Sequence, residues 1–250
     1  MPDSLPVISN QTGAHEDLSE VVSKHLRTAF LRPIPTWVDQ TAGDILAQCE
    51  GRPLILDSGC GTGHSTVRIA TENPDCLVVG IDQSAHRLKR SPVALSASGE
   101  YTGRTTHMAQ QQGADTPFRP PAFPPFPDNV LFVRADVQDL WRALLQRGVR
   151  LHSHYLLYPN PWPKAHHLMR RWHGHPVWPS LLALGGRIQM RTNWEIYALE
   201  FHQALLMGDA SSISMDIVLN LDALAQPMSL FEKKYAESGH TLWRVTADLQ

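Results

Sequence analysis

The sequence predicts an α/β fold in which an open, mostly parallel sheet places its functional residues at the carboxyl ends of the strands. Short apolar runs of strand length alternate with segments of helical periodicity along most of the 250 residues. A glycine-rich turn follows the first apolar run, and an acidic residue ends the second. A proline-stiffened loop follows the fourth. The 42% hydrophobic content is enough for one substantial core.

The first 50 residues are expected to form a helical arm or cap, and residues 51–250 the main domain. Apolar residues recur at helical spacing from Leu18 to Leu26, which predicts one helix. Prolines at 33 and 35 end it, and a second helix is expected over 36–48. The segment is either a simple cap or an arm that lies over the site.

The first predicted strand, over 53–57, leads into Ser58-Gly59-Cys60-Gly61-Thr62-Gly63. Glycines let the backbone turn tightly and approach a ligand closely. The second strand, over 76–81, ends at Asp82, where a ribose-binding carboxylate is expected in a βαβ unit. A G-x-G-x-G turn preceded by an acid is typical of S-adenosylmethionine methyltransferases. Binding of NAD is the alternative, although those enzymes use G-x-G-x-x-G.

Regular patterning stops after a short helix that begins at Ala85. Residues 91–128 are rich in Ser, Gly, Gln, Thr and Pro, which predicts an insertion without a core of its own. It is either a linker or a cover whose phenylalanines reach the active site. Beyond it, strands are expected over 130–135, 151–158, 187–193, 212–219 and 241–247, the last two as an antiparallel pair. Helices are expected over 140–147, 177–184 and 194–206.

A marked charge asymmetry surrounds the fourth strand. Residues 140–194 contain no Asp or Glu but eight Lys and Arg. Helical spacing in the segment that follows the proline loop places Lys164, His167 and Arg171 on one polar flank. His166, Arg170 and His173 fall on the other. The pattern indicates a surface for a polyanion such as RNA. The alternative is a solvated surface that lacks acids by chance.

Several classes of protein are disfavoured by the sequence. No apolar run approaches the length of a membrane span, and the first residues do not resemble a signal peptide. The three cysteines show no C-x-x-C spacing, so we expect reduced thiols and a cytoplasmic location. The histidine pairs lack cysteine or carboxylate partners, and no metal is expected.

The chain resembles the tRNA (guanine-N7)-methyltransferase family. Four blocks carry the resemblance, and they are Leu56-Asp-Ser-Gly-Cys-Gly-Thr-Gly63, Tyr158-Pro-Asn-Pro-Trp-Pro-Lys164 through Arg170-Arg171, Thr192-Asn-Trp-Glu-Ile-Tyr197, and Ser229-Leu-Phe-Glu-Lys-Lys-Tyr235. The first block is common to class I methyltransferases, whereas the second and fourth are specific to the family. The resemblance implies a doubly wound, Rossmann-like sheet of seven strands, mostly parallel with an antiparallel C-terminal strand.

The resemblance also implies the ligands and the residues that contact them. S-adenosylmethionine is the expected cofactor, and tRNA the expected partner and substrate. The residues implied for the cofactor are Asp57, Gly59, Gly61, Gly63, Asp82, Gln83, Asp136 and Val137. Those implied for the substrate are Lys164, Arg170, Arg171, Thr192, Asn193, Ser229, Phe231 and Glu232, with Asn160 at the catalytic position. A monomer and a homodimer both remain open.

Two departures from the family pattern bear on the reaction. Asn160 stands where the family has a carboxylate between the two prolines, and Asn193 stands where it has the acid of a Thr-Asp pair. One hypothesis is therefore guanine-N7 methylation with Glu195 or Glu232 supplying the missing charge. A second is methylation of another target, such as an exocyclic amine or a small heterocycle. A third is a non-catalytic RNA-binding protein, although a retained cofactor turn argues against it.

Overall fold

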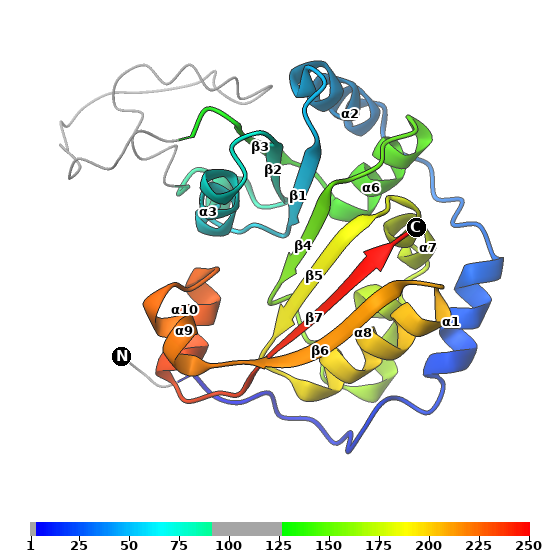
Figure 1. Ribbon diagram of the computed structural model, residues 1–250. Helices are drawn as coiled ribbons and strands as arrows, with labels where there is room; N and C mark the ends of the chain where they lie inside the picture. The colour runs from blue at the N-terminus through cyan, green and yellow to red at the C-terminus, as the bar shows by residue number, and fades with distance from the viewer. Residues whose placement is uncertain (1–3, 92–126) are drawn as a thin grey trace.

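A single seven-stranded sheet organises the chain in the computed structural model, which describes residues 4–91 and 127–250 (Figure 1). The strands are β1 (Leu54–Ser58), β2 (Leu77–Asp82), β3 (Val130–Arg134), β4 (Ser153–Leu157), β5 (Gly186–Thr192), β6 (Ser211–Val218) and β7 (Leu242–Leu249). Their order across the sheet is β3-β2-β1-β4-β5-β7-β6. The bounds of all seven strands lie within two residues of those that the sequence predicted.

The helices follow the predicted alternation. They are α1 (Leu18–Arg27), α2 (Thr36–Cys49), α3 (His64–Glu72), α4 (Ala85–Leu88), α6 (Val137–Gln146), α7 (Trp178–Ala183), α8 (Glu195–Met207), α9 (Asn220–Ala225) and α10 (Leu230–Glu237). Local chemistry sets several starts. The Asp136 side chain accepts from the Gln138 N–H at the start of α6, and Ser229 accepts from the Glu232 N–H at the start of α10.

The strand directions place one edge of the sheet at the functional site. The five strands β3, β2, β1, β4 and β5 run parallel to one another, while β7 runs antiparallel to its neighbours β5 and β6. The predicted doubly wound sheet with an antiparallel C-terminal strand is therefore confirmed. The chain order reverses between β1 and β4, so their carboxyl ends open a crevice. Gly59 follows one of these ends and Tyr158 the other.

Two apolar layers cover the sheet. Alternate residues of β1 take part in different clusters, with Leu54 and Leu56 on one face and Ile55 on the other. The larger cluster joins the sheet to α1, α2, α6, α7 and α8. On the opposite face Ile69 of α3 packs near Met228, which precedes α10, and Figure 1 shows α3 and the α9–α10 pair on that side.

Two features differ from the sequence prediction, and a third predicted feature falls outside the described residues. Residues 165–174 form two short 3-10 helices, η1 (Ala165–Arg170) and η2 (Trp172–Gly174), rather than one amphipathic α-helix. The helices α9 and α10 were not predicted. The expected insertion over 91–128 falls almost wholly outside the described residues. No helix in the described part of the chain is long and apolar enough to cross a membrane.

Candidate active site

The glycine-rich turn after β1 is built for close approach of a ligand. Gly59, Gly61 and Gly63 have φ angles of 82°, 61° and 76°, values that L side chains rarely adopt. A Cβ atom at Gly59 or Gly61 would meet nothing within 4 Å, whereas one at Gly63 would lie 2.2 Å from the Phe132 ring. The first two glycines therefore leave open space, and the third permits close packing onto β3.

Asp57 lies beneath this turn and is 1% exposed. Its Oδ2 accepts hydrogen bonds from the hydroxyls of Ser65 at 2.6 Å and Thr66 at 2.7 Å. Its Oδ1 is buried without a hydrogen-bond partner among the described residues. Burial, together with the nearby charge of Asp82, raises the pKa of Asp57 to about 6 against the opposing effect of the two hydroxyls. The orphaned oxygen is a ready acceptor for a ligand that donates hydrogen bonds.

Two further carboxylates lie at the ends of the neighbouring strands. Asp82 accepts from the Gly61 N–H at 3.0 Å and from the Ser84 N–H at 2.7 Å, which fixes its orientation beside the turn. Arg87 reaches the same carboxylate with Nη1 at 3.2 Å. Asp136 is held by the backbone N–H and the side-chain amide of Gln138. Both acids are thus positioned before any ligand binds.

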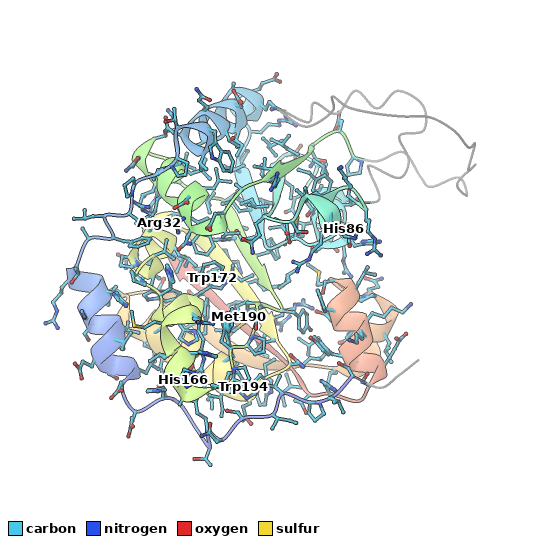
Figure 2. All side chains as sticks on the ribbon, turned by 180° about the vertical axis from the view of Figure 1, so that it is seen from behind. Arg32, His86, His166, Trp172, Met190 and Trp194 are labelled. Carbon is cyan, nitrogen blue, oxygen red and sulfur yellow. The ribbon has the colours of Figure 1, made fainter. Side chains whose placement is uncertain are left out.

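A cavity of about 430 Å³ joins these elements to the proline-rich loop. Its lining is Gly59, Asp82, Gln83, Arg87, Asp136, Val137, Gln138, Trp162, Met169, Arg170, Trp172 and His175. Five residues expected at the cofactor and one expected at the substrate therefore meet in one cavity. Asp57, Gly61 and Gly63 are not part of its lining. The sequence analysis missed the aromatic wall, which includes Trp172, labelled in Figure 2.

The proline-rich loop holds an unusual backbone conformation. Tyr158 and Trp162 have φ angles of 53° and 46°, which is uncommon for bulky residues and is often found at functional sites. Asn160 is exposed, and its Oδ1 accepts from the Trp162 N–H at 3.3 Å. The guanidinium of Arg170 lies 4.8 Å from the centre of the Trp162 ring. The loop thus presents an amide and an indole beside the cavity.

Arg171 does not have the solvent-facing role expected for it. Its side chain is fully buried, and Nη1 lies 2.7 Å from Oε1 of Glu200 on α8. His173 is also buried and lies 2.9 Å from the other oxygen of this carboxylate. Burial opposes the charge of Glu200, but hydrogen bonds from His173 and Arg171 outweigh burial and lower its pKa to about 2. The predicted polar flanks are therefore wrong for Arg171 and His173, because the 3-10 turns rotate them toward α8.

Residues 140–194, which contain no acid, form a less basic surface in the folded protein than their sequence suggests. Five of its arginines pair with carboxylates, as Arg142–Asp139, Arg147–Asp39, Arg171–Glu200, Arg187–Asp248 and Arg191–Glu232. Four of these acids lie more than twenty residues away along the chain. Lys164 and Arg170 are exposed beside the proline loop. The extended RNA footprint inferred from charge alone is thus reduced to this smaller region and to Arg150, which is exposed and donates to the Ala183 carbonyl.

The remaining residues implied for the substrate differ greatly in exposure. Thr192 is buried and accepts from the Trp194 N–H, whereas Phe231 is 52% exposed. Asn193 shares a 3.0 Å hydrogen bond with His240. Ser229 caps α10, as described above. Lys164, which immediately precedes η1, is exposed like Phe231.

Glu232 is fully buried, and its existing bonds occupy it. Its Oε1 accepts from Arg191 at 2.8 Å and from the Met228 N–H at 3.1 Å. Its Oε2 accepts from the Tyr158 hydroxyl at 3.0 Å. This carboxylate anchors the first residue of the proline loop, so it is not a free charge for a substrate. The suggestion that Glu232 replaces a missing acid is therefore wrong for this structure.

An N-terminal arm lies across this region before α1. Ser9 donates to the Pro163 carbonyl at 2.6 Å, and Gln11 and the His15 N–H donate to Glu200. Ser4 forms hydrogen bonds with Ser238 and His240, which lie in the turn between α10 and β7. The arm therefore supports the outer side of the proline loop.

The three cysteines, Cys49, Cys60 and Cys76, are free thiols.

Comparison with known proteins decides the family. A family model described as "Putative methyltransferase" matches residues 51–245. The chain belongs to this family. The curated relatives of this methyltransferase include the tRNA (guanine-N(7)-)-methyltransferase of Neisseria meningitidis serogroup B, 26% identical over 88% of this chain and 84% of the relative. The enzyme of the same name from Chromobacterium violaceum is 27% identical over 80% of this chain and 78% of the relative.

The fold of this methyltransferase also matches solved structures. One is a mutant 16S rRNA (adenine(1408)-N(1))-methyltransferase with cosubstrate SAM from Catenulisporales acidiphilia. It is 15% identical to this methyltransferase, with a TM-score of 0.52 and coverage of 84% of this chain and 91% of that chain. At this identity the match supports the fold alone. The resemblance inferred from the four sequence blocks is confirmed by the family match and the curated relatives.

Proposed function

We propose that this methyltransferase transfers a methyl group from S-adenosylmethionine to N7 of a guanine in tRNA, in the cytoplasm. One observation carries the proposal, namely that the glycine turn, two strand-end acids and the proline loop all line a single cavity. The curated relatives act on this base, which supports the choice of acceptor.

The residues around the glycine turn fit the cofactor. Gly59 and Gly61 leave room for close approach, and Asp82 lies where a ribose is bound in related sheets. The buried, unpartnered Oδ1 of Asp57 fits a ligand that donates hydrogen bonds. Asp136 is placed to accept a hydrogen bond from the amino group of the cofactor's adenine. S-adenosylmethionine supplies an electrophilic methyl group on a sulfonium centre.

The chain's own contribution is alignment and exclusion of water. Methyl transfer is an in-line displacement, so a rigid acceptor loop accounts for much of the rate. Three prolines, two strained φ angles and the Tyr158–Glu232 bond stiffen the loop that carries Asn160. Guanine N7 is an unprotonated lone pair and needs no general base. The loop therefore needs to hold the base rather than to move a proton.

Asn160 takes the position where relatives of this pattern have an acid. Its Oδ1 can accept one hydrogen bond from the guanine edge, which becomes more acidic as the ring gains positive charge. An amide lacks the charge of a carboxylate, and losing a charge-assisted bond costs on the order of 1–3 kcal/mol. Glu195 is exposed in the first turn of α8 and is the remaining candidate for that charge.

The replacement of two acids by Asn160 and Asn193 favours a second candidate function. An amide oxygen paired with an amide N–H suits a neutral acceptor, such as an exocyclic amine, better than a ring that becomes cationic. The reaction would then transfer the methyl group from the same cofactor to an amine nitrogen, which releases one N–H proton to water as its C–N bond forms.

A direct assay separates the two functions. Purified protein is incubated with tritiated S-adenosylmethionine and bulk tRNA, and the product is treated with borohydride and aniline. Label in tRNA together with strand scission at the modified base supports N7 methylation. Label without scission points to a different acceptor. Cofactor binding with no transfer to tRNA or to cell extract would contradict both.

A further inference from the structure

A second cavity, of about 580 Å³, lies on the face of the sheet that carries α3 and α9. It shares no lining residue with the candidate active site. Three arginines from three elements line it, Arg68 of α3, Arg191 of β5 and Arg244 of β7. Figure 1 shows α3 and α9 flanking this side of the sheet. Of its lining, only Glu232 is a residue that the family resemblance implies for the substrate, and the proposed reaction does not use its carboxylate.

Two of these arginines form a like-charged pair. Arg191 and Arg244 are direct partners in the antiparallel register of β5 and β7, so their side chains leave the sheet side by side. Like charges in this arrangement destabilise a sheet. Each has one carboxylate neighbour, Glu232 at 2.8 Å from Arg191 and Asp216 at 3.3 Å from Arg244. The acids lie to different sides of the pair and do not bridge it.

Both guanidinium groups also retain an unused donor. The Nε atoms of Arg191 and Arg244 are buried and have no hydrogen-bond partner among the described residues. Buried donors in folded proteins nearly always find an acceptor. Two orphaned N–H groups on adjacent cations therefore indicate an acceptor that binds between them.

We propose that this cavity binds a phosphate group. Guanidinium groups match the oxygens of a phosphate in planar, two-pronged hydrogen bonds, and one dianion would relieve the repulsion between the two cations. Arg68, which pairs with Glu72 through Nε at 2.8 Å and also donates to the Gln226 carbonyl, closes the site from α3. Ile217 and Leu219 at the rim are 53% and 63% exposed, which suits the less polar remainder of a nucleotide.

The phosphate has two possible sources, and the position of the cavity favours one of them. Glu232 lines it and also holds Tyr158, the first residue of the proline loop. A nucleotide flanking the base at the active site would bring its backbone phosphate to this side. The assignment of the ligand to an RNA phosphate rests on the proposed function. A free phosphate ester is the other source, and the cavity chemistry is the same for both.

The first arm of the test uses inorganic phosphate alone. Wild-type protein should show a rise in Tm with phosphate beyond that seen with chloride at equal ionic strength. Arg244→Gln should lose most of this rise, and Arg68→Gln should reproduce the loss from another element. Arg187→Gln is the matched control, because Arg187 lies on β5, is paired with Asp248 at 3.4 Å and does not line the cavity. Equal phosphate shifts in the wild type, Arg244→Gln and Arg68→Gln would overturn the site.

The second arm measures tRNA binding as a function of salt. Arg244→Gln should lower the slope of log affinity against log salt by about 1, whereas Arg187→Gln should leave it unchanged. This result together with the lost phosphate shift identifies an RNA phosphate as the ligand. A lost phosphate shift with an unaltered RNA slope identifies a free phosphate ester. Because the first arm needs neither cofactor nor RNA, it decides the site even if tRNA is not methylated.

Discussion

Arg171 on the proline-loop side and Glu200 on α8 form a fully buried ion pair, with Nη1 and Oε1 2.7 Å apart. Arg171 also donates to the Trp162 carbonyl, so the pair ties the loop beside the cavity to the helix behind it. The neighbouring Arg170 is exposed and lines the cavity. Adjacent residues of the same type therefore differ in their surroundings: Arg171 supports the loop from inside the fold, whereas we propose that the exposed Arg170 contacts RNA.

Replacing Arg171 by Ala should destabilise the fold. The variant leaves the Glu200 carboxylate buried without its main partner, which costs about 3–5 kcal/mol. Urea unfolding should show this as a lower midpoint with an unchanged slope. Adding Glu200→Leu should recover part of the loss, because the uncompensated charge is then removed. A stability change below about 1 kcal/mol in the single variant would contradict the buried pair.

Replacing Arg170 by Ala should act on RNA instead. The fold should keep its stability within about 0.5 kcal/mol, because the side chain is exposed. Affinity for tRNA should fall and the salt slope should drop by about 1, as expected for one lost phosphate contact. Filter binding at several salt concentrations measures both quantities. An unaltered slope would remove Arg170 from the RNA surface.

Asn160→Asp tests the proposed acceptor. A carboxylate at this position would stabilise the positive charge that develops on guanine during N7 methylation. Single-turnover transfer to tRNA should therefore become faster, by roughly tenfold for about 1.4 kcal/mol. Asn193→Asp serves as the matched change at the second altered position. A slower rate in Asn160→Asp would show that the amide is adapted to a different nitrogen.

Asp57 should leave a pH signature on stability. Because its pKa in the folded protein is about 6 and its ordinary value is 3.8, the folded state holds this proton more tightly than the unfolded state. The contribution of Asp57 to stability therefore falls as pH rises from about 4 to about 6, by about 3 kcal/mol at most. The difference between wild type and Asp57→Asn in urea midpoints should trace this window. A difference independent of pH would refute the raised pKa.

The same carboxylate should govern cofactor affinity. Its ionised form favours a positively charged ligand, so the affinity for S-adenosylmethionine should weaken as pH falls below about 6. Calorimetric titrations at pH 5 and 7 measure the change. Asp57→Asn should bind weakly at both values and show no such dependence. A wild-type affinity that is equal at both values would exclude Asp57 from the cofactor's electrostatics.

The sequence predicted the sheet well because its signals are local. The apolar runs of β1 and β2 are fully buried, and the glycines between them need positive φ angles that few other residues adopt. Both properties can be recognised within a ten-residue window. The acids that end β2 and precede α6 could be placed for the same reason.

The contacts that the sequence could not predict are distant ones. Arg171 reads as a surface residue because its partner Glu200 lies 29 residues away, and only the packed fold brings them together. Glu232 similarly meets Arg191 across 41 residues. The 3-10 turns of η1 and η2 change which side chains face inward, and an assumed period of 3.6 residues hides this. Charge counted along the chain thus overestimated the basic surface.

The N-terminal arm also links the proline loop to residues much later in the chain. Ser4 is held by Ser238 and His240, so this end of the arm becomes anchored only after those residues have been synthesised. Before that point Ser4 lacks both of these hydrogen-bond partners. Because β7 follows directly and pairs with both β5 and β6, this end of the arm and that edge of the sheet are expected to become ordered together.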